Sequence, residues 1–431
     1  MNELVPLMYN LRLGQATLTG RVQYRRFRGE EDDSSSSDLE LTAAGPQWTG
    51  PAVTELIKPS WLLADYELRI VESTQFLGRQ AYFVEATRRE TSKGFVFSRS
   101  YVDRASAVVD AATGILLRYE MVDDYGEVST AEFADLVVSG EPADHAGAGV
   151  SDEVLNLLYR TELQPPRFSA RLHEWADQGA QAKIAGRLIA QSSESRLVQR
   201  LGRFTAGHTL EQTSLYARIS VAAPASANTS GAVSGRQSGD RAVRYRIDFE
   251  RDRAPKVQST ICDGERRWLI HTDRVVIKGA KPLPAGLSLM ADLSWLLDGL
   301  ELTSAGSATV AGRDTVLICA VPDDDHEGGT SPLSNGPVLA NKIETSVDAE
   351  LGIALSQQWH FDDQLVLRTE LADVQTDVDD DAFRYEVPRG IRVVVNPNPL
   401  AEAGVSPGMV VRQAAASILT GFARRLGGGR S

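Results

Sequence analysis

The chain has 431 residues, of which 42% are hydrophobic and 24% are charged, and its formal net charge is −13 at pH 7. This length exceeds that of one ordinary domain, and the hydrophobic share is sufficient for sizeable buried cores. Because an acidic protein of this kind is repelled by phosphate backbones, we expect no nucleic acid partner.

The first residues and the hydropathy of the chain predict no membrane span. Met1 to Tyr9 contain Glu3 and only a short apolar run, whereas a signal peptide needs a basic start and a longer apolar stretch. No run of about 18 apolar residues occurs, so we expect no transmembrane segment. The sequence as given predicts a cytoplasmic protein, or an extracytoplasmic one if a leader has been removed.

Alternating apolar residues and Asp-x-x-x-Gly turn signals predict a chain that is mostly antiparallel β. In chain order, the clearest strands are Ala81–Ala86, Ser106–Val109, Ile115–Tyr119, Thr315–Cys319, Lys342–Val347 and Ile353–Phe361. The predicted helices are Val53–Leu63, Asp152–Tyr159, Ala170–Asp177, Leu287–Leu297 and Met409–Leu426. Solvated loops are predicted for Glu30–Asp38, Ala222–Asp240 and Asp323–Pro337. The fold class expected from this pattern is therefore α+β.

Short motifs occur twice in the same order, which indicates an internal duplication. The pairs are Gln15–Val22 with Gln181–Leu188, Ser60–Leu63 with Ser294–Leu297, Gly78-Arg79 with Gly312-Arg313, Val109–Ile115 with Val347–Ile353, and Ala134-Asp135 with Ala372-Asp373. The interval from Gly20 to Trp61 is 41 residues in the first copy, whereas the interval from Gly186 to Trp295 is 109 residues in the second. We therefore expect a reduced first copy at 1–145, a helical connector at 146–180, a fuller second copy at 181–398, and a C-terminal helix with a tail at 399–431.

Motifs that carry known chemistry are absent from the sequence. The six histidines are scattered without metal-ligand spacing, and no nucleophile elbow or phosphate-binding loop occurs. Cys262 and Cys319 lie in apolar runs that predict two buried thiols. The acidic runs Asp323–Glu327 and Asp379–Asp381 are typical of solvated turns. We therefore expect no catalytic residue, no metal site and no cofactor, and an enzyme with unrecognised chemistry stays an open alternative.

Three segments of the second copy resemble the lipoprotein-carrier and sigma-E-regulator (LolA/RseB-like) fold family. They are Arg244–Phe249 followed by Pro255, Asp263-Gly264 and Trp268; the hairpin at Asp348–Gly352; and the ending Phe383–Val393. The resemblance covers roughly residues 180 to 395 and implies two tandem half-barrels, each a curved antiparallel sheet over helices. It also implies an apolar cavity between the sheet and the helices.

The resemblance leads to a binding function rather than to catalysis. We expect a non-enzymatic protein that binds an apolar or lipid-like ligand, or a lipidated or hydrophobic peptide; the alternative is a regulatory scaffold that binds a partner protein. The predicted cavity residues are Trp61, Trp268, Leu289, Leu293, Trp295, Leu296 and Trp359. Core packing of helix on sheet is the other interpretation of the repeated tryptophans Trp61 and Trp295. The sequence leaves the ligand and the oligomeric state open.

Overall fold

The computed structural model divides the chain into two units. Unit 1 contains Met1–Leu163 and Asp292–Ser304, and unit 2 contains Gln164–Ala291 and Ala305–Ser431. The described residues are 3–10, 17–28, 31–42, 45–47, 51–89, 102–122, 127–139, 149–159, 167–181, 183–184, 212–222, 243–250, 257–322 and 340–395. The short segment Asp292–Ser304 belongs to unit 1 although it lies in the middle of the predicted second copy. The predicted domain boundaries stay predictions.

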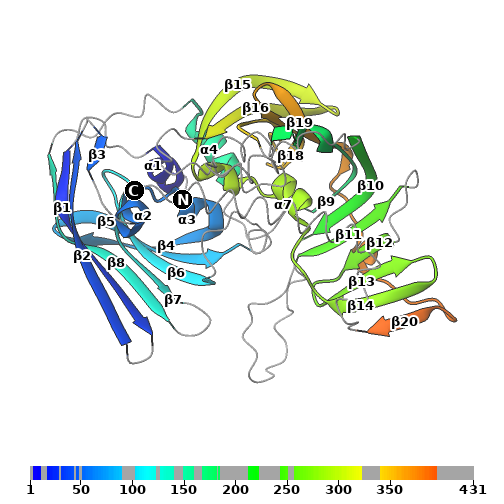
Figure 1. The fold of residues 1–431 in the computed structure, drawn as a ribbon, viewed down its shortest axis with the longest axis horizontal. Helices are drawn as coiled ribbons and strands as arrows, with labels where there is room; N and C mark the ends of the chain where they lie inside the picture. The colour runs from blue at the N-terminus through cyan, green and yellow to red at the C-terminus, as the bar shows by residue number, and fades with distance from the viewer. Residues whose placement is uncertain are drawn as a thin grey trace, which may run out of the picture. The chain divides into compact units, whose positions relative to one another are not determined.

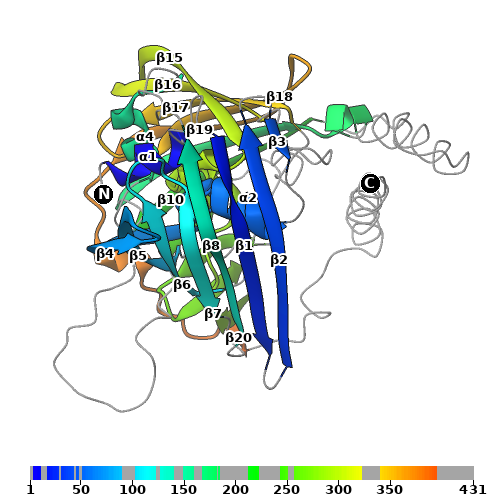
Figure 2. The ribbon, with the colours of Figure 1, turned by 90° about the vertical axis from the view of Figure 1, so that its left-hand side faces the viewer.

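Unit 1 is an antiparallel sheet of eight strands with helices on one face (Figures 1 and 2). Its strands are β1 (Thr17–Arg28), β2 (Glu31–Thr42), β3 (Gly45–Gln47), β4 (Tyr66–Phe76), β5 (Arg79–Arg88), β6 (Arg104–Asp110), β7 (Leu116–Val122) and β8 (Val128–Ser139), in the spatial order β3-β2-β1-β8-β7-β6-β5-β4. Its helices are α1 (Leu4–Asn10), α2 (Pro51–Ile57), α3 (Ser60–Asp65), α4 (Asp152–Tyr159) and the 3-10 helix η2 (Ser294–Leu297). Leucines and aromatic rings fill the layer between the helices and the sheet.

Unit 2 is built on a sheet of twelve strands, antiparallel except where its last strand joins its neighbour in parallel. The strands are β9 (Phe168–Asp177), β10 (Gln212–Ala222), β11 (Arg244–Phe249), β12 (Val257–Cys262), β13 (Arg266–His271), β14 (Arg274–Gly279), β15 (Leu300–Val310), β16 (Arg313–Pro322), β17 (Lys342–Asp348), β18 (Ala354–Phe361), β19 (Gln364–Gln375) and β20 (Arg392–Val395). The spatial order is β15-β16-β17-β18-β19-β9-β10-β11-β12-β13-β14-β20. Helix α7 (Ala285–Ala291) packs on β18, and the 3-10 helix η4 (Asp380–Phe383) packs on β11.

The strand orders confirm the duplication. In unit 1 the run β4-β5-β6-β7-β8-β1-β2 has the same order as β15-β16-β17-β18-β19-β9-β10 in unit 2. The second sheet continues beyond β11 with β12, β13, β14 and β20. The second copy is therefore the fuller one in strands.

Each copy contains an ion pair between an arginine and a buried aspartate at the equivalent position. Arg79 donates two hydrogen bonds to Asp110, at 2.8 and 2.9 Å, and Arg313 contacts Asp348 in the equivalent position. Asp110 is 1% exposed and Asp348 is 0% exposed. Each arginine follows a glycine at positive φ, Gly78 at 74° and Gly312 at 78°, which permits the two-residue turn that leads into the strand. The repeated Gly-Arg and Asp motifs thus form the same turn and the same ion pair in both copies.

The structure corrects several predicted elements. Ala170–Asp177 is part of strand β9 rather than a helix, and burial alternates along the first part of this strand, Phe168–Leu172. Of the predicted strand at Gln181, the described residues Gln181, Lys183 and Ile184 are helical. Glu30–Asp38, predicted as a loop, falls largely in β2, which pairs with β1 over eleven residues. The predicted helix Leu287–Leu297 is broken into α7 and η2.

Other predictions agree with the structure or fall outside its described part. The helix Asp152–Tyr159 and both hairpins with an Asp-x-x-x-Gly turn are confirmed. Cys262 is buried, whereas Cys319 is only half-buried, and both are free thiols. Most of Ala222–Asp240, and the whole of Asp323–Pro337 and of Met409–Leu426, lie outside the described residues.

Candidate functional site

The structure distributes the predicted cavity residues over three buried clusters. Trp61, Leu293, Trp295 and Leu296 lie in unit 1, whereas Leu289, Trp359 and Trp268 lie in unit 2. All seven side chains are at most 8% exposed. Burial is typical of core packing and of cavity lining alike, so their role as ligand contacts stays a proposal.

Trp61 has the contacts of a packed core residue. Its ring meets Tyr66 and Tyr119 edge to face, with centroids 6.0 and 5.7 Å apart. Its indole N–H donates to the carbonyl of Glu55 at 3.1 Å, and the Glu55 carboxylate accepts a hydrogen bond from the hydroxyl of Tyr119. Burial, followed by the charge of Glu55, raises the pKa of Tyr119, which therefore stays neutral. Helix α2 thus ties Trp61 to the sheet.

The second Ser-Trp-Leu-Leu segment packs against the first. Ser294 donates a hydrogen bond to the carbonyl of Ala64, and Ser60 donates one to the carboxylate of Asp298, both at 3.0 Å. Positions 60 and 294 correspond in the repeat, and so do positions 64 and 298. The two contacts are therefore reciprocal, as in a two-fold dimer interface. This arrangement places Trp295 in the core of unit 1.

The remaining predicted residues divide between two places in unit 2. Leu289 lies in α7, and its carbonyl accepts a hydrogen bond of 2.9 Å from the side-chain amide of Gln357 on β18, the strand that carries Trp359. Trp268 lies apart from them, in a small cluster with Ile261 and Val275 on β12 to β14. Three residues of the ending that resembles the carrier family pack against this cluster: Tyr385, Val387 and Ile391.

A row of side chains crosses each sheet at equivalent positions on the face that the helices cover. In unit 1 the row is Val84, Ala107, Tyr119, Ala131 and Tyr24. In unit 2 it is Ile318, Thr345, Gln357, Thr369 and Glu174. The first row is apolar or aromatic, and its Tyr119 packs against Trp61. The second carries four consecutive polar side chains, which we call the polar stripe: Thr345, Gln357, Thr369 and Glu174.

The polar stripe lies deep in the unit. Thr345, Gln357 and Thr369 are 3%, 1% and 4% exposed, and Glu174 is half-buried at one end. A Cβ atom on Gly286 of α7 would stand 3.4 Å from the carboxylate of Glu174, so this helix reaches the end of the stripe. Four adjacent strands carry it, which corresponds to a length of about 14 Å.

Several groups of the stripe lack hydrogen-bond partners within the described part of the chain. The Thr345 hydroxyl is fully buried and has none. The Glu174 carboxylate has no ion pair there, and burial alone raises its pKa. Buried polar groups are nearly always paired in native proteins, so an unpaired group of this kind needs an explanation. A bound ligand with hydrogen-bond donors would supply one.

Sequence reasoning missed the polar stripe. Each of its residues is one polar position in an otherwise apolar strand face, as Thr345 is between Ile343 and Val347. The available signal was the comparison of the two copies at Ala107 and Thr345, or at Tyr119 and Gln357. That comparison requires the strand register, because Glu174 and Thr369 are neighbours only across the sheet.

The described residues offer neither a metal-binding cluster nor a membrane-spanning helix. Within the residues that the structure describes, no cluster of three His, Cys, Asp or Glu side chains could hold a metal ion. No described helix is both long and apolar enough to cross a membrane. Asp379–Asp381 forms the N-cap and the first two residues of η4, where Asp380 pairs with Arg167 and Arg244. The Asp323–Glu327 run lies outside the described residues.

Comparison with known proteins found similarity among solved structures alone. No family model matches the sequence, and no curated protein matches it. An uncharacterised conserved protein from Thermus thermophilus is 10% identical and has a TM-score of 0.27, covering 56% of this chain and 97% of that one. A chain of the Pseudomonas aeruginosa MucA/MucB complex is 15% identical with a TM-score of 0.21, covering 57% of this chain and 86% of that one. A LolA superfamily protein from Nitrosomonas europaea is 8% identical with a TM-score of 0.20, covering 54% and 95%. The solved structures that are similar to this chain thus include a protein of the LolA superfamily, which the sequence also resembles.

Proposed function

We propose that this protein is a non-catalytic binding protein, and that unit 2 holds an amphipathic amine between its sheet and helix α7. The observation that carries the proposal is the polar stripe, whose Thr345 hydroxyl and Glu174 carboxylate have no partner among the residues that the structure describes. A ligand there would supply hydrogen-bond partners to these two groups, and it would gain affinity from doing so.

The composition of the stripe favours a ligand rich in donors. The side-chain amide nitrogen of Gln357 donates to the carbonyl of Leu289, and its side-chain oxygen can act only as an acceptor. The Glu174 carboxylate is an acceptor when ionised, and threonine hydroxyls both donate and accept. An ammonium group has three donors and no acceptor, so it fits this set, whereas a fatty acid carboxylate would be repelled by Glu174.

The residues beside the stripe favour an apolar chain on the same ligand. Two positions along each strand from the stripe, the covered face is apolar on both sides. These residues are Leu172, Leu371, Leu355 and Val347 on one side, and Ala176, Leu367, Trp359 and Ile343 on the other. Burial of a methylene group against such a surface contributes about 0.8 kcal/mol. Trp359, predicted from the sequence as a cavity residue, is one of these neighbours.

Calorimetry with two ligands of equal chain length tests the proposal. Dodecylamine is expected to bind the full-length protein at pH 7, and dodecanoate is expected to bind at least tenfold more weakly. Glu174→Gln should weaken dodecylamine binding by at least tenfold, since it removes the charge that faces the ammonium group. Tyr24→Phe changes the equivalent position of unit 1 and should leave binding unchanged.

The controls separate this proposal from simpler explanations. Equal binding of both ligands, with no effect of Glu174→Gln, would indicate apolar binding without the stripe and would overturn the proposal. Absence of binding by either ligand would mean that ordered water satisfies the stripe.

A further inference from the structure

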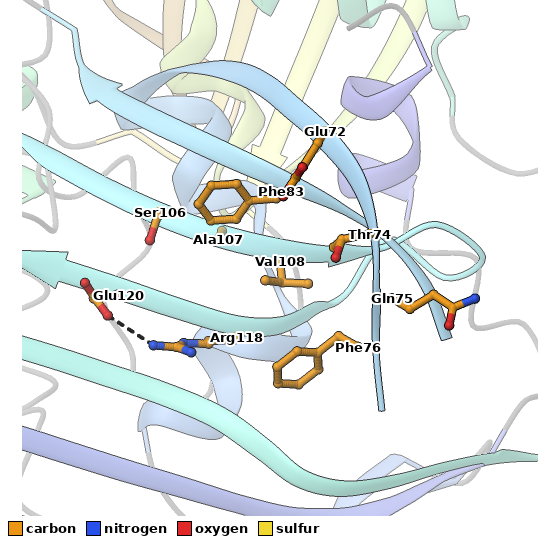
Figure 3. A pocket seen from close by; sticks show the side chains of 10 residues that line it. All are labelled: Glu72, Thr74, Gln75, Phe76, Phe83, Ser106, Ala107, Val108, Arg118 and Glu120. Atoms are coloured by element: carbon orange, nitrogen blue, oxygen red, sulfur yellow. Dashed lines mark hydrogen bonds and ion pairs between the residues drawn. The ribbon is translucent and has the colours of Figure 1, made fainter. Parts of the chain in front are cut away.

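The face of the unit 1 sheet that lies opposite the helices carries an open pocket of about 390 Å³ (Figure 3). Strands β4 to β7 all contribute to it. Phe76, Phe83 and Val108 make its apolar part, and Glu72, Glu120 and Arg118 stand around them, as Figure 3 shows. None of the cavity residues predicted from the sequence lines this pocket.

The charged side chains around the pocket favour a cationic group as its occupant. Arg118 is engaged by Glu120 at 3.1 Å and by Glu132 at 3.8 Å. Glu72 has no ion pair among the residues that the structure describes, and it lies opposite Phe83 on the neighbouring strand. The faces of aromatic rings attract cations, and the apolar stem of a lysine or arginine packs on such rings. The pocket therefore complements a basic side chain better than an acidic or a purely apolar one.

Beside the pocket, β4 is the edge strand of its sheet. The first part of this edge is already covered, because Leu68 donates its backbone N–H to the hydroxyl of Tyr159 at 2.7 Å. A bulge then displaces Val71 from the register with β5. From Glu72 to Phe76 no described residue hydrogen-bonds with the outer side of the strand, and Glu72, Ser73 and Gln75 are exposed.

The register identifies which peptide groups face outward. Gln75 lies opposite Gln80, and the carbonyl of Gln80 accepts a hydrogen bond from Ala111, on the side away from β4. In an antiparallel pair, residues whose groups point away from the partner alternate with residues that bond to it. The N–H and C=O groups of Gln75, and those of Ser73 two residues earlier, therefore point to the free edge.

The second copy lacks these features at the equivalent places. Glu72, Phe76 and Phe83 correspond to Gly306, Val310 and Leu317. Val108 and Arg118, which pair across β6 and β7, correspond to the paired Ser346 and Ser356. The aromatic and charged lining is thus particular to the first copy and does not follow from the shared fold.

We infer that the β4 edge and this pocket together bind an extended segment of a partner protein that carries a lysine or arginine. The segment adds as a further strand along Glu72–Phe76, its peptide groups pair with those of Ser73 and Gln75, and its basic side chain enters the pocket toward Glu72. Backbone pairing of this kind supplies affinity, and the side-chain pocket supplies specificity. The net charge of −13 assists the approach of a basic segment. This interaction is separate from the ligand proposed for unit 2.

Labelled heptapeptides with the sequence Gly-Val-Thr-Lys-Thr-Val-Gly test the inference by fluorescence anisotropy on the full-length protein. Replacing the central lysine with glutamate should weaken binding at least tenfold. N-methylation of alternate backbone nitrogens on the pairing side should do the same, because it blocks the strand ladder. Glu72→Gln in the protein should weaken binding of the lysine peptide severalfold and leave the glutamate peptide unaffected.

Two proline variants of the protein provide a matched pair. Ser73→Pro removes an outward N–H without breaking a bond to β5, so the fold should persist while peptide binding is lost. Ser307→Pro makes the same change at the equivalent exposed position of β15 and should leave binding intact. Binding that survives both Ser73→Pro and N-methylation would overturn the strand pairing. Equal binding of the lysine and glutamate peptides would overturn the basic specificity. The N-methylated peptide decides the question even if Ser73→Pro fails to fold.

Discussion

Ser60 donates a hydrogen bond of 3.0 Å to the carboxylate of Asp298, a residue 238 positions later in the chain. Its counterpart Ser294 donates one of the same length to the carbonyl of Ala64. A segment of the second copy thus completes the core of unit 1 through contacts that are reciprocal between the copies. The stability of unit 1 therefore depends on residues from both copies.

Removal of the Ser294 hydroxyl should destabilise unit 1. Ser294 is 1% exposed, so Ser294→Ala breaks a buried hydrogen bond and leaves the Ala64 carbonyl unpaired. We expect a loss of about 1 kcal/mol in the free energy of unfolding, measured by urea titration with tryptophan fluorescence. Ser307→Ala, at an exposed position of β15, is the control and should change little. Equal stability of both variants would contradict the role of the contact.

Replacement of Asp348 should reduce stability and alter its acid dependence. Burial acts to raise the pKa of Asp348, but hydrogen bonds from Arg313 and from the N–H groups of Leu351 and Glu350 outweigh it and lower the pKa. The carboxylate therefore stabilises the fold above its ordinary pKa, and this stabilisation is lost as the pH falls through the lowered value, below about pH 4. Asp348→Asn should cost about 2–3 kcal/mol at pH 7, less than a fully buried pair because Arg313 is partly exposed.

The acid dependence of that variant is the sharper measurement. Thermal unfolding between pH 2.5 and pH 7 should show a smaller loss of stability on acidification for Asp348→Asn than for the unmodified protein. Asp363→Asn, at an exposed turn position with positive φ, should follow the unmodified protein. Parallel curves for all three proteins would show that the Asp348 carboxylate contributes nothing to acid unfolding.

Glu174→Gln should stabilise the unliganded protein at neutral pH. Burial raises the pKa of Glu174, so the carboxyl favours the folded state in its protonated form, and this contribution is lost as the pH rises through the raised pKa. The neutral amide avoids that loss, and we expect a gain of about 1 kcal/mol at pH 7 that disappears toward pH 4. Glu301→Gln, on the exposed side of β15, should have no such effect. A variant that gains stability while losing amine binding would show the cost of maintaining a binding group in the core.

Trp61→Ala should affect stability and not ligand binding. The ring packs edge to face on Tyr66 and Tyr119, so its removal should cost about 3–5 kcal/mol. Dodecylamine affinity should be unchanged under conditions where the variant is still folded, because the polar stripe lies in unit 2. Trp61→Phe serves as the milder variant. A loss of amine affinity without a loss of stability would instead favour the cavity interpretation of Trp61.

The repeat could be predicted from the sequence only at positions where the structure requires particular residue types. Gly-Arg and Asp-x-x-x-Gly recur because a positive-φ turn and a buried Arg-Asp pair require those residue types. The match of Gln15–Val22 with Gln181–Leu188 is wrong. The counterpart of Arg21 is Arg171 on β9: Arg21 donates its backbone N–H to Asp135, and Arg171 contacts Asp373. A short alternating pattern that contains Gly-Arg can recur by chance. The pairing of each strand with its neighbour in the sheet instead identifies which positions of the two copies are equivalent.

The sequence by itself determined the antiparallel β class, the duplication and the turn positions, because these depend on alternation and on local turn chemistry. Tertiary structure alone decided that Trp295 packs with the first copy, since Leu287–Leu297 is broken between α7 and η2. It also assembled the polar stripe and the pocket beside the β4 edge, whose residues come from several strands. The physical reason is that the periodicity of the sequence fixes which face of a sheet a residue occupies. Strand pairing and register decide which residue lies beside it.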